Sequence, residues 1–251
     1  MTWSYSRISS FCQCPYEFYL RYIENNKSEE NFFGQYGSFI HKILEKYAKG
    51  ELSIFELSKY YEDNFDLEIT CDAPYSMGDL RQAYFEKGLD YLDNIDLILD
   101  EYEVLGVEKK VSFSIDGYSF IGFIDLLLKD KTSGKILIID HKSRALKFKK
   151  NGELSKTDSP AFEGFKRQLY LYSKGIIDEY KIAPSKLCWN MFKERKWIST
   201  DFHQDEYEQA LQWAKWTIDM IKLEDEWKPN PEFYYCKYLC GMRNQACEYK
   251  M

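Results

Sequence analysis

The fold is decided by residues 104–143, which read VLGVEKKVSFSIDGYSFIGFIDLLLKDKTSGKILIIDHKS. Two turn signals divide this stretch into three predicted strands, residues 104–115, 118–128 and 135–143. Asp116-Gly117 suits the positive φ angles of a tight hairpin, and the polar, Gly-ended run 131–134 suits a second turn. The third strand is apolar on both faces, so we expect it in a sheet that is covered on both sides.

Three ionisable residues, Asp125, Asp140 and Lys142, interrupt these strands. Because strand side chains alternate, Asp140 and Lys142 share one face and His141 takes the other. If the second strand pairs beside the third, Asp125 comes level with Asp140. Two such carboxylates repel each other unless a cation lies between them, and oxygen ligands of this kind suit magnesium or manganese. The alternative is that both aspartates merely end their strands and face water. The Asp-His-Lys ending of a buried type of strand favours the metal site.

Length and composition bound the architecture. A chain of 251 residues forms one large domain or two small ones. No repeat, low-complexity tract or Gly/Ser linker divides it, so we expect a single domain over residues 1–251. Its portions are mainly helical (1–100), a sheet core (101–203), and a long helix with a cysteine-rich tail (204–251). No apolar run approaches the roughly 20 residues of a membrane span. The first residues lack the features of a signal peptide, so we expect a cytoplasmic protein.

The charge distribution allows contact with nucleic acid. A net charge of -7 argues against a protein coated in basic residues, but binding requires only a local basic surface. Basic residues follow the third strand directly, and we take four of them as candidate DNA contacts: Arg144, Lys147, Lys149 and Lys150. The alternative is an ordinary solvated lysine-rich loop. The position of this segment next to the predicted metal site favours phosphate contact.

Seven cysteines occur in a chain without a secretory signal, so we do not expect disulfides. Cys236, Cys240 and Cys247 crowd the C-terminal end, which suggests a metal or a metal cluster. Cys71 and Cys188 have no partner pattern and are most simply core thiols.

Apolar residues at helical spacing predict helices around the strands. The predicted helices lie at residues 16–22, around 39–47, and at 53–64, 79–93, 163–175 and 207–221, with a further hairpin over 187–202. His41 lies beside the apolar stripe of the second helix, where a lone histidine is usually structural or exposed. Gln168 and Tyr172 are four apart and share a helix face, an arrangement also common on half-buried helix surfaces.

Four short motifs occur in a fixed order: Gly37-x-x-x-His41-x-x-Leu44, Gly122-x-x-Asp125, Asp140-x-Lys142 and Gln168-x-x-x-Tyr172. In this order, and in these strand and helix contexts, they resemble the RecB-like branch of the PD-(D/E)XK nuclease superfamily. The relevant members are the AddB and CRISPR-associated exonuclease types, and the resemblance spans nearly the whole chain. It implies an α/β fold of the restriction-endonuclease type, with a mixed central sheet flanked by helices.

The resemblance also implies roles for individual residues. His41, Asp125, Asp140 and the backbone carbonyl of His141 match the ligands of Mg²⁺ or Mn²⁺. Lys142 matches the residue that orients or activates the attacking water, and Gln168 and Tyr172 match residues that steady this lysine and contact the substrate. This chemistry agrees with the residues themselves. A divalent ion activates water and neutralises phosphate, and Lys142 adds positive charge where negative charge develops.

The cysteines carry a second resemblance. Some RecB-like nucleases bind a four-iron, four-sulfur (4Fe-4S) cluster through one N-terminal and three C-terminal cysteines. Cys14, followed by Pro15, is similar to the first, and Cys236, Cys240 and Cys247 are similar to the others. Three and six residues separate the last three cysteines, where the commoner pattern has two and five. Cys12 is a possible substitute for Cys14. Zinc is the competing occupant, because four thiolates also suit it. A C-terminal zinc knuckle without Cys14 is the simpler alternative.

These observations together predict a metal-dependent DNA nuclease with an iron–sulfur cluster tying the chain ends. The preference for exonuclease action at DNA ends comes from the resemblance alone. One alternative is a nuclease fold that binds DNA without cutting it, although the intact Asp125, Asp140 and Lys142 count against this. Another is an accessory subunit of a recombination, replication or CRISPR-type complex. The chain has no phosphate-binding Gly-rich loop, so a motor function would have to come from a protein partner.

Overall fold

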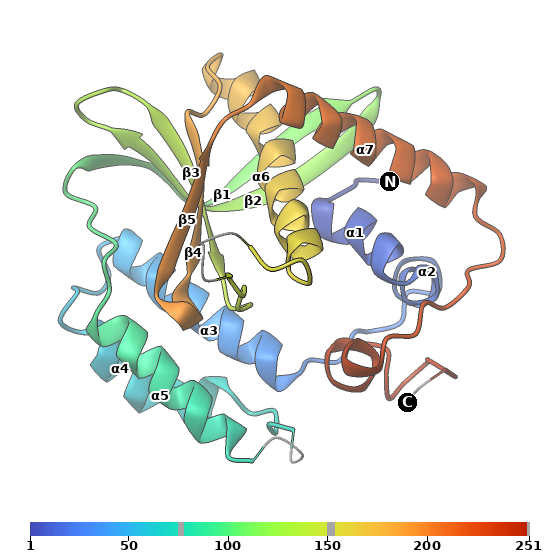
Figure 1. Ribbon diagram of the computed structural model, residues 1–251, viewed down its shortest axis with the longest axis horizontal. Helices are drawn as coiled ribbons and strands as arrows, with labels where there is room; N and C mark the ends of the chain where they lie inside the picture. The colour runs from blue at the N-terminus through green and yellow to red at the C-terminus, as the bar shows by residue number, and fades with distance from the viewer. Residues whose placement is uncertain (75–77, 150–153, 250–251) are drawn as a thin grey trace.

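The structure, a computed structural model, describes residues 1–74, 78–149 and 154–249. Its centre is a five-stranded mixed sheet in the order β1-β2-β3-β4-β5 (Figure 1). Only the central pair, β3 and β4, runs parallel, and the other neighbours are antiparallel. The strands are β1 (Tyr102–Ile115), β2 (Tyr118–Asp130), β3 (Ile136–Lys142), β4 (Lys186–Met191) and β5 (Lys196–Asp201).

The two predicted turns connect the first three strands. Asp116 and Gly117 have φ angles of 45° and 84°, the pair of positive values that a tight hairpin needs. In the second turn Oδ1 of Asp130 accepts hydrogen bonds from the backbone N–H groups of Thr132 and Ser133. The predicted three-strand arrangement is therefore confirmed, with β2 running on to Asp130.

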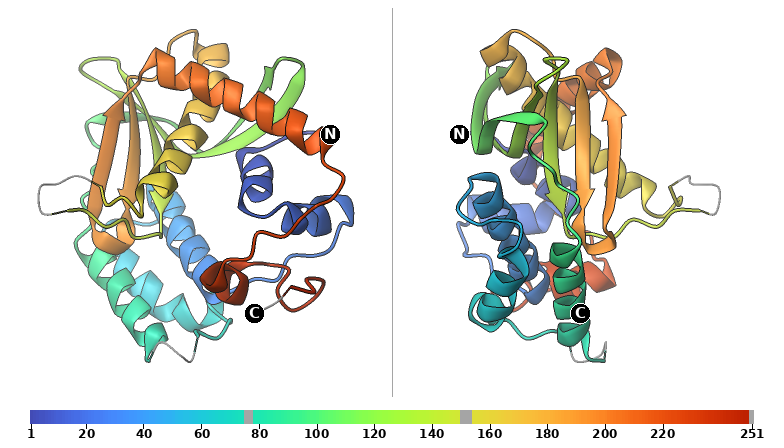
Figure 2. Two further views of the ribbon diagram at one scale, coloured as in Figure 1. Left: turned by 45° about the vertical axis from the view of Figure 1, so that its right-hand side comes forward. Right: turned by 90° about the vertical axis from the view of Figure 1, so that its left-hand side faces the viewer.

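Both faces of the central strands are buried, as the apolar run of β3 predicts. On one face, a core that includes Leu127, Ile138 and Trp189 packs against α1 (Tyr5–Gln13), α6 (Ser159–Tyr180) and α7 (Gln204–Leu223). Figure 2 shows α6 and α7 lying across the sheet. On the other face, a smaller core containing Leu126, Ile139 and Cys188 packs against Leu97 and the C-terminal end of α3.

A group of three helices lies at one end of the sheet (Figure 1): α3 (Phe32–Ala48), α4 (Leu57–Glu68) and α5 (Leu80–Asp93). They share their own apolar core, which Phe192 of η3 (Phe192–Glu194) joins. Asn31 caps α3 and Asp79 caps α5 through their side chains. Residues 53–56 form a turn before α4, so the helix predicted over 53–64 begins and ends four residues later.

The two chain ends meet beside the sheet. α2 (Pro15–Phe18) continues into the π-helix η1 (Tyr19–Ile23), and a second π-helix, η4 (Tyr235–Leu239), lies against it. The Tyr235 hydroxyl donates to Glu17 at 2.7 Å. Trp3 adds to the sheet, since its N–H donates to the Ser119 carbonyl at 2.8 Å and its own carbonyl accepts from Ile121. Among the described helices, none combines the length and apolar character of a membrane-spanning segment.

Candidate metal and nucleic-acid site

The site forms where β2 and β3 separate. Their pairing ends at Leu126 and Ile139, so the next residues in register, Asp125 and Asp140, stand level but are not paired. Asp125 fills the gap, because its Oδ2 accepts the N–H of His141 at 2.7 Å. The His141 ring is buried, with Nδ1 3.0 Å from the amide nitrogen of Asn190.

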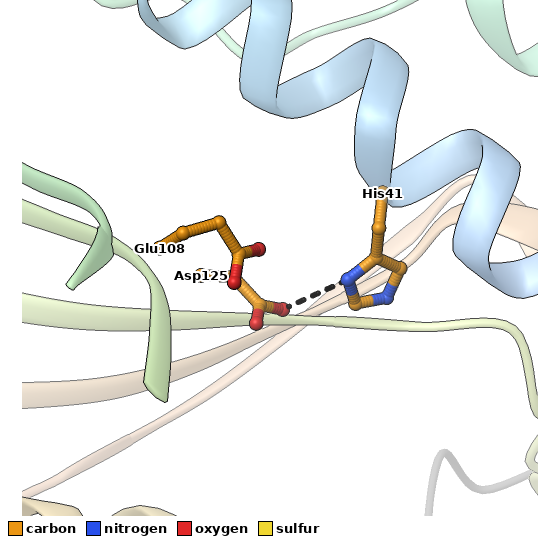
Figure 3. Close-up of side chains that lie close together, drawn as sticks. All are labelled: His41, Glu108 and Asp125. Carbon is orange, nitrogen blue, oxygen red and sulfur yellow. Dashed lines mark ion pairs between the residues drawn. The ribbon is translucent and has the colours of Figure 1, made fainter. Parts of the chain in front are cut away.

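His41 reaches this opening from α3 (Figure 3). Its Nε2 lies 2.9 Å from the carbonyl oxygen of His141, and because a carbonyl only accepts, Nε2 must carry the proton. Burial lowers the pKa of His41, which favours a neutral ring with an unprotonated Nδ1. That nitrogen lies 3.5 Å from Oδ2 of Asp125. Nδ1 of His41 and Oδ2 of Asp125 both offer an electron pair, so together they can provide two ligands to a cation.

Glu108 completes the group, a residue that sequence reasoning missed. Its carboxylate, Asp125 and His41 offer ligand atoms that all lie within 4.8 Å of one another (Figure 3). The flanking register pairs, Val107 with Leu126 and Lys109 with Ile124, place Glu108 opposite Asp125. Burial, followed by the charge of Asp125, raises the pKa of Glu108. The available signal was the Asp116-Gly117 turn, because counting back along the two strands from this turn places residue 108 opposite residue 125.

Asp140 and Lys142 form a second group beside the first. Asp140 is 4% exposed and its Oδ2 makes no well-oriented hydrogen bond, yet it lies 2.7 Å from Nζ of Lys142. Lys142 also donates to Oε1 of Gln168 at 2.8 Å, and its Nζ stands 4.8 Å from the centre of the Phe165 ring. The ammonium group is thus held in one place by three side chains.

Two of the motif glycines make room for these contacts. A Cβ on Gly122 would lie 2.3 Å from Cε1 of Tyr172, so the tyrosine ring occupies the space that any other residue would fill. A Cβ on Gly37 would lie 3.2 Å from Oγ of Ser143. Burial raises the pKa of Tyr172 to about 12, so its hydroxyl stays protonated near neutral pH.

The donor set fits a divalent cation. Burial, with the neighbouring Asp140 as a second cause, raises the pKa of Asp125 to about 7. A carboxylate held in such surroundings gains stability when a positive charge joins it. Two carboxylates with one imidazole, and the poorly satisfied Asp140 oxygen nearby, are ligands that magnesium or manganese accepts.

A cleft of about 580 Å³ contains most of the predicted site residues. It brings together His41, Asp125, Asp140, His141, Lys142 and Gln168 and adds Glu108, while Tyr172 lies outside its lining. Of the predicted DNA contacts, Arg144 lines the cleft. Lys147 and Lys149 are exposed on the segment after β3 and do not line it. Lys150 lies outside the described residues.

Four cysteines line one small pocket of about 20 Å³ between the chain ends: Cys14, Cys236, Cys240 and Cys247. Cys12 is exposed and does not line it, so Cys14 is the N-terminal cysteine that meets the other three. Glu17, only 4% exposed, lines the pocket as well. Burial, followed by the charge of Glu17, raises the pKa of Cys240 to about 12.

Comparison with known proteins identifies the fold family. A crystal structure of a candidate exonuclease from Eubacterium rectale is similar with a TM-score of 0.57 at 12% identity, covering 100% of this chain and 90% of that one. At that identity the likeness concerns the fold alone. The structure of SSO0001 aligns over 97% of both chains at 18% identity, but its TM-score of 0.34 carries no argument. No curated protein matches the sequence significantly. The family model described as the PD-(D/E)XK nuclease superfamily matches residues 2–250, and the chain therefore belongs to this superfamily of metal-dependent nucleases.

Proposed function

We propose that this protein is a RecB-like DNA nuclease that hydrolyses phosphodiester bonds at DNA ends with Mg²⁺ or Mn²⁺. The observation that supports this proposal best is that His41, Glu108 and Asp125 lie together beside the Asp140–Lys142 pair in one open cleft. A nuclease fold that merely binds DNA would have no use for a half-buried group of cation ligands next to a held ammonium.

The cation would be held by Nδ1 of His41 and by the carboxylates of Asp125 and Glu108, with Asp140 adjacent. When bound, it would lower the pKa of a water molecule and neutralise charge on the phosphate. Asp125 ties the site to β3, because the oxygen that faces His41 also accepts the N–H of His141. The strand ending and the ligand group are therefore fixed relative to each other.

Lys142 supplies the fixed positive charge of the reaction. Asp140 and Gln168 hold its Nζ at 2.7 and 2.8 Å, so no reorganisation is needed when negative charge develops on the phosphoryl oxygens. The ammonium can also donate to the attacking water and orient it. Gln168 acts through Lys142, and Tyr172 lies one helical turn from Gln168 on α6.

Action at DNA ends is supported by the RecB-like motifs and by the similar structure described as a candidate exonuclease. Arg144 at the cleft provides a guanidinium for backbone phosphates.

The cysteine pocket supports a 4Fe-4S cluster as a second metal centre. Zn–S bonds of about 2.3 Å would place tetrahedral thiolates roughly 3.8 Å apart. Among the described residues, the cysteines form no group of three with sulfurs within 4.8 Å of one another. Four thiols that share a pocket but stand further apart suit a cluster larger than a single ion.

A nuclease assay with three isosteric variants, Glu108→Gln, Asp125→Asn and Asp140→Asn, tests the metal site. On end-labelled linear DNA with magnesium or manganese, each should reduce cleavage to the level seen with a chelator. Glu45→Gln is the matched control, because Glu45 lines the same cleft but pairs with Lys49. Covalently closed DNA should resist the wild type if cutting starts at ends. A folded Asp140→Asn variant with near-normal activity would contradict the site, and rapid cutting of closed DNA would contradict end dependence.

A further inference from the structure

A second groove of about 750 Å³ continues from the catalytic cleft. Phe33, Gly34, Ser143 and Arg144 line both spaces, so a chain leaving the cleft past Arg144 enters this groove directly. Its far wall comes from a different part of the sequence, the segment around Tyr234 that precedes the C-terminal cysteines.

A row of aromatic rings lines the groove. Tyr84 of α5, Phe33 of α3 and Tyr234 follow one another, with ring centres 5.7 Å apart for the first pair and 6.4 Å for the second. Phe33 and Tyr84 are half-buried, whereas Tyr234 is 39% exposed. The row thus ends in its most exposed ring, which lies against Phe33 and Tyr238.

The charges of the groove favour an anion. Arg144 is exposed at the junction with the cleft. Nζ of Lys193 donates to the Tyr84 hydroxyl at 2.6 Å and lies 4.0 Å from the centre of that ring. Glu232 is the one acidic residue among the described residues that line the groove. Its two carboxylate oxygens accept the backbone N–H groups of Tyr234 and Tyr235, which satisfies them within the protein.

We propose that this groove holds the unpaired nucleotides of a single DNA strand beside the scissile phosphate, with a base stacked on Tyr234 and phosphates along Arg144 and Lys193. The proposal rests on the proposed nuclease function and deepens it. An aromatic row next to basic groups is the arrangement that binds single strands, because every base has a face that can stack. A duplex hides those faces, so the groove selects an unpaired strand.

Equilibrium binding tests the stacking ring. A fluorescent single-stranded oligonucleotide is titrated in the presence of a chelator, so that nothing is cut, and anisotropy is recorded. Tyr234→Ala should raise Kd about 5- to 150-fold, the range for loss of one base stack. Tyr234→Phe keeps the ring and should retain tight binding. Phe55→Ala removes an aromatic ring that is 93% exposed away from the groove, and should leave Kd unchanged. Melting curves check that the variants are folded.

Two further titrations make the test specific. With a blunt duplex, Tyr234→Ala should leave Kd unchanged. A series of single strands, each with one abasic position, is then titrated. At one position the missing base should lower the affinity of the wild type but not that of Tyr234→Ala, because the variant has already lost the stack. If Tyr234→Ala weakened binding to duplex and single strand equally, the groove assignment would be wrong. The same holds if the wild type cuts DNA but Tyr234→Ala binds the single strand as tightly as the wild type. Neither result would affect the proposed nuclease function. A folded wild type that neither binds nor cuts DNA would overturn the proposed function as well.

Discussion

At the scale of single residues, the fixed position of Lys142 leads us to expect an effect on the cleavage rate that is larger than the effect on DNA affinity. Its ammonium is held against Asp140 and Gln168 before any substrate arrives. Lys142→Ala should therefore lower the single-turnover rate by about 100- to 1000-fold, the usual loss for one preorganised donor, while Kd changes much less. Lys59→Ala, which removes an exposed lysine of α4 that pairs with Asp63 and does not line the cleft, is the control and should leave the rate unchanged. If Lys142→Ala weakened only binding, Lys142 would be a simple phosphate contact.

Gly122 should be intolerant of even the smallest side chain. A Cβ there would overlap Tyr172, 2.3 Å away, so Gly122→Ala should destabilise the fold by about 1–3 kcal/mol through overpacking. Thermal or denaturant unfolding measures this. Adding Tyr172→Ala should recover part of the loss, because the clash partner is gone. Gly34→Ala, whose Cβ would meet nothing closer than 3.7 Å, should cost little. If the losses of unfolding free energy in Gly122→Ala and Tyr172→Ala simply added up in the double variant, the predicted contact would be contradicted.

The sequence located part of the candidate site and missed one member. Asp140 and Lys142 stood out because two charged residues end an apolar strand, and Asp125 because it lies on the strand that pairs beside it. Glu108 sits in a charged run of an edge strand, where carboxylates are commonplace. Its position opposite Asp125 follows by counting from the Asp116-Gly117 turn, because the register shifts only beyond Glu108, between Val104 and Gly106. Its approach to His41 depends on where α3 packs, which no local pattern encodes.

At the scale of elements, turn and cap residues in the sequence predicted where strands and helices begin and end, whereas the bounds of elements without such residues were predicted less well. The Asp116-Gly117 turn fixed the β1–β2 hairpin, and Asp79 marked the start of α5. The π-helices η1 and η4 have no such marker, and no side chain caps either of them. The pairing of Trp3 with β2 is a contact between distant residues, which no local pattern encodes.

The tail element η4 and α2 should share one metal centre. Anaerobically purified protein should be brown, with broad absorption at roughly 400 nm, as thiolate-ligated iron–sulfur clusters show. Cys14→Ser and Cys247→Ser should each remove this absorption, because both cysteines line the pocket. Cys12→Ser and Cys71→Ser should keep it, since neither residue lines the pocket. Retained colour in Cys14→Ser together with loss in Cys12→Ser would reverse the assignment of the N-terminal ligand.

At the scale of the whole molecule, a cluster at this pocket would close nearly the entire chain into one loop. Closing a long loop restricts the unfolded chain, and ligands bound only in the folded state add to stability. Cys14→Ser should therefore melt at a lower temperature than wild type, whereas Cys71→Ser should not. Iron, sulfide and zinc contents, measured on wild type beside Cys14→Ser, identify the occupant. Stoichiometric zinc without iron, unchanged by losing Cys14, would replace the cluster with a C-terminal zinc knuckle and leave the nuclease site unaffected.

The meeting of the chain ends also sets the order in which the molecule is completed during synthesis. The Tyr16 hydroxyl donates to Glu248, 232 residues later, and Cys14 lines its pocket with residues from the same tail. Ribosomes add about 5–20 residues per second, so the N-terminal cysteine waits about 10 to 50 s for its partners to be made. The sheet and α3 can assemble in that interval, but the cysteine pocket cannot. A nascent chain that is released early would carry the nuclease cleft together with an unmatched thiol at Cys14.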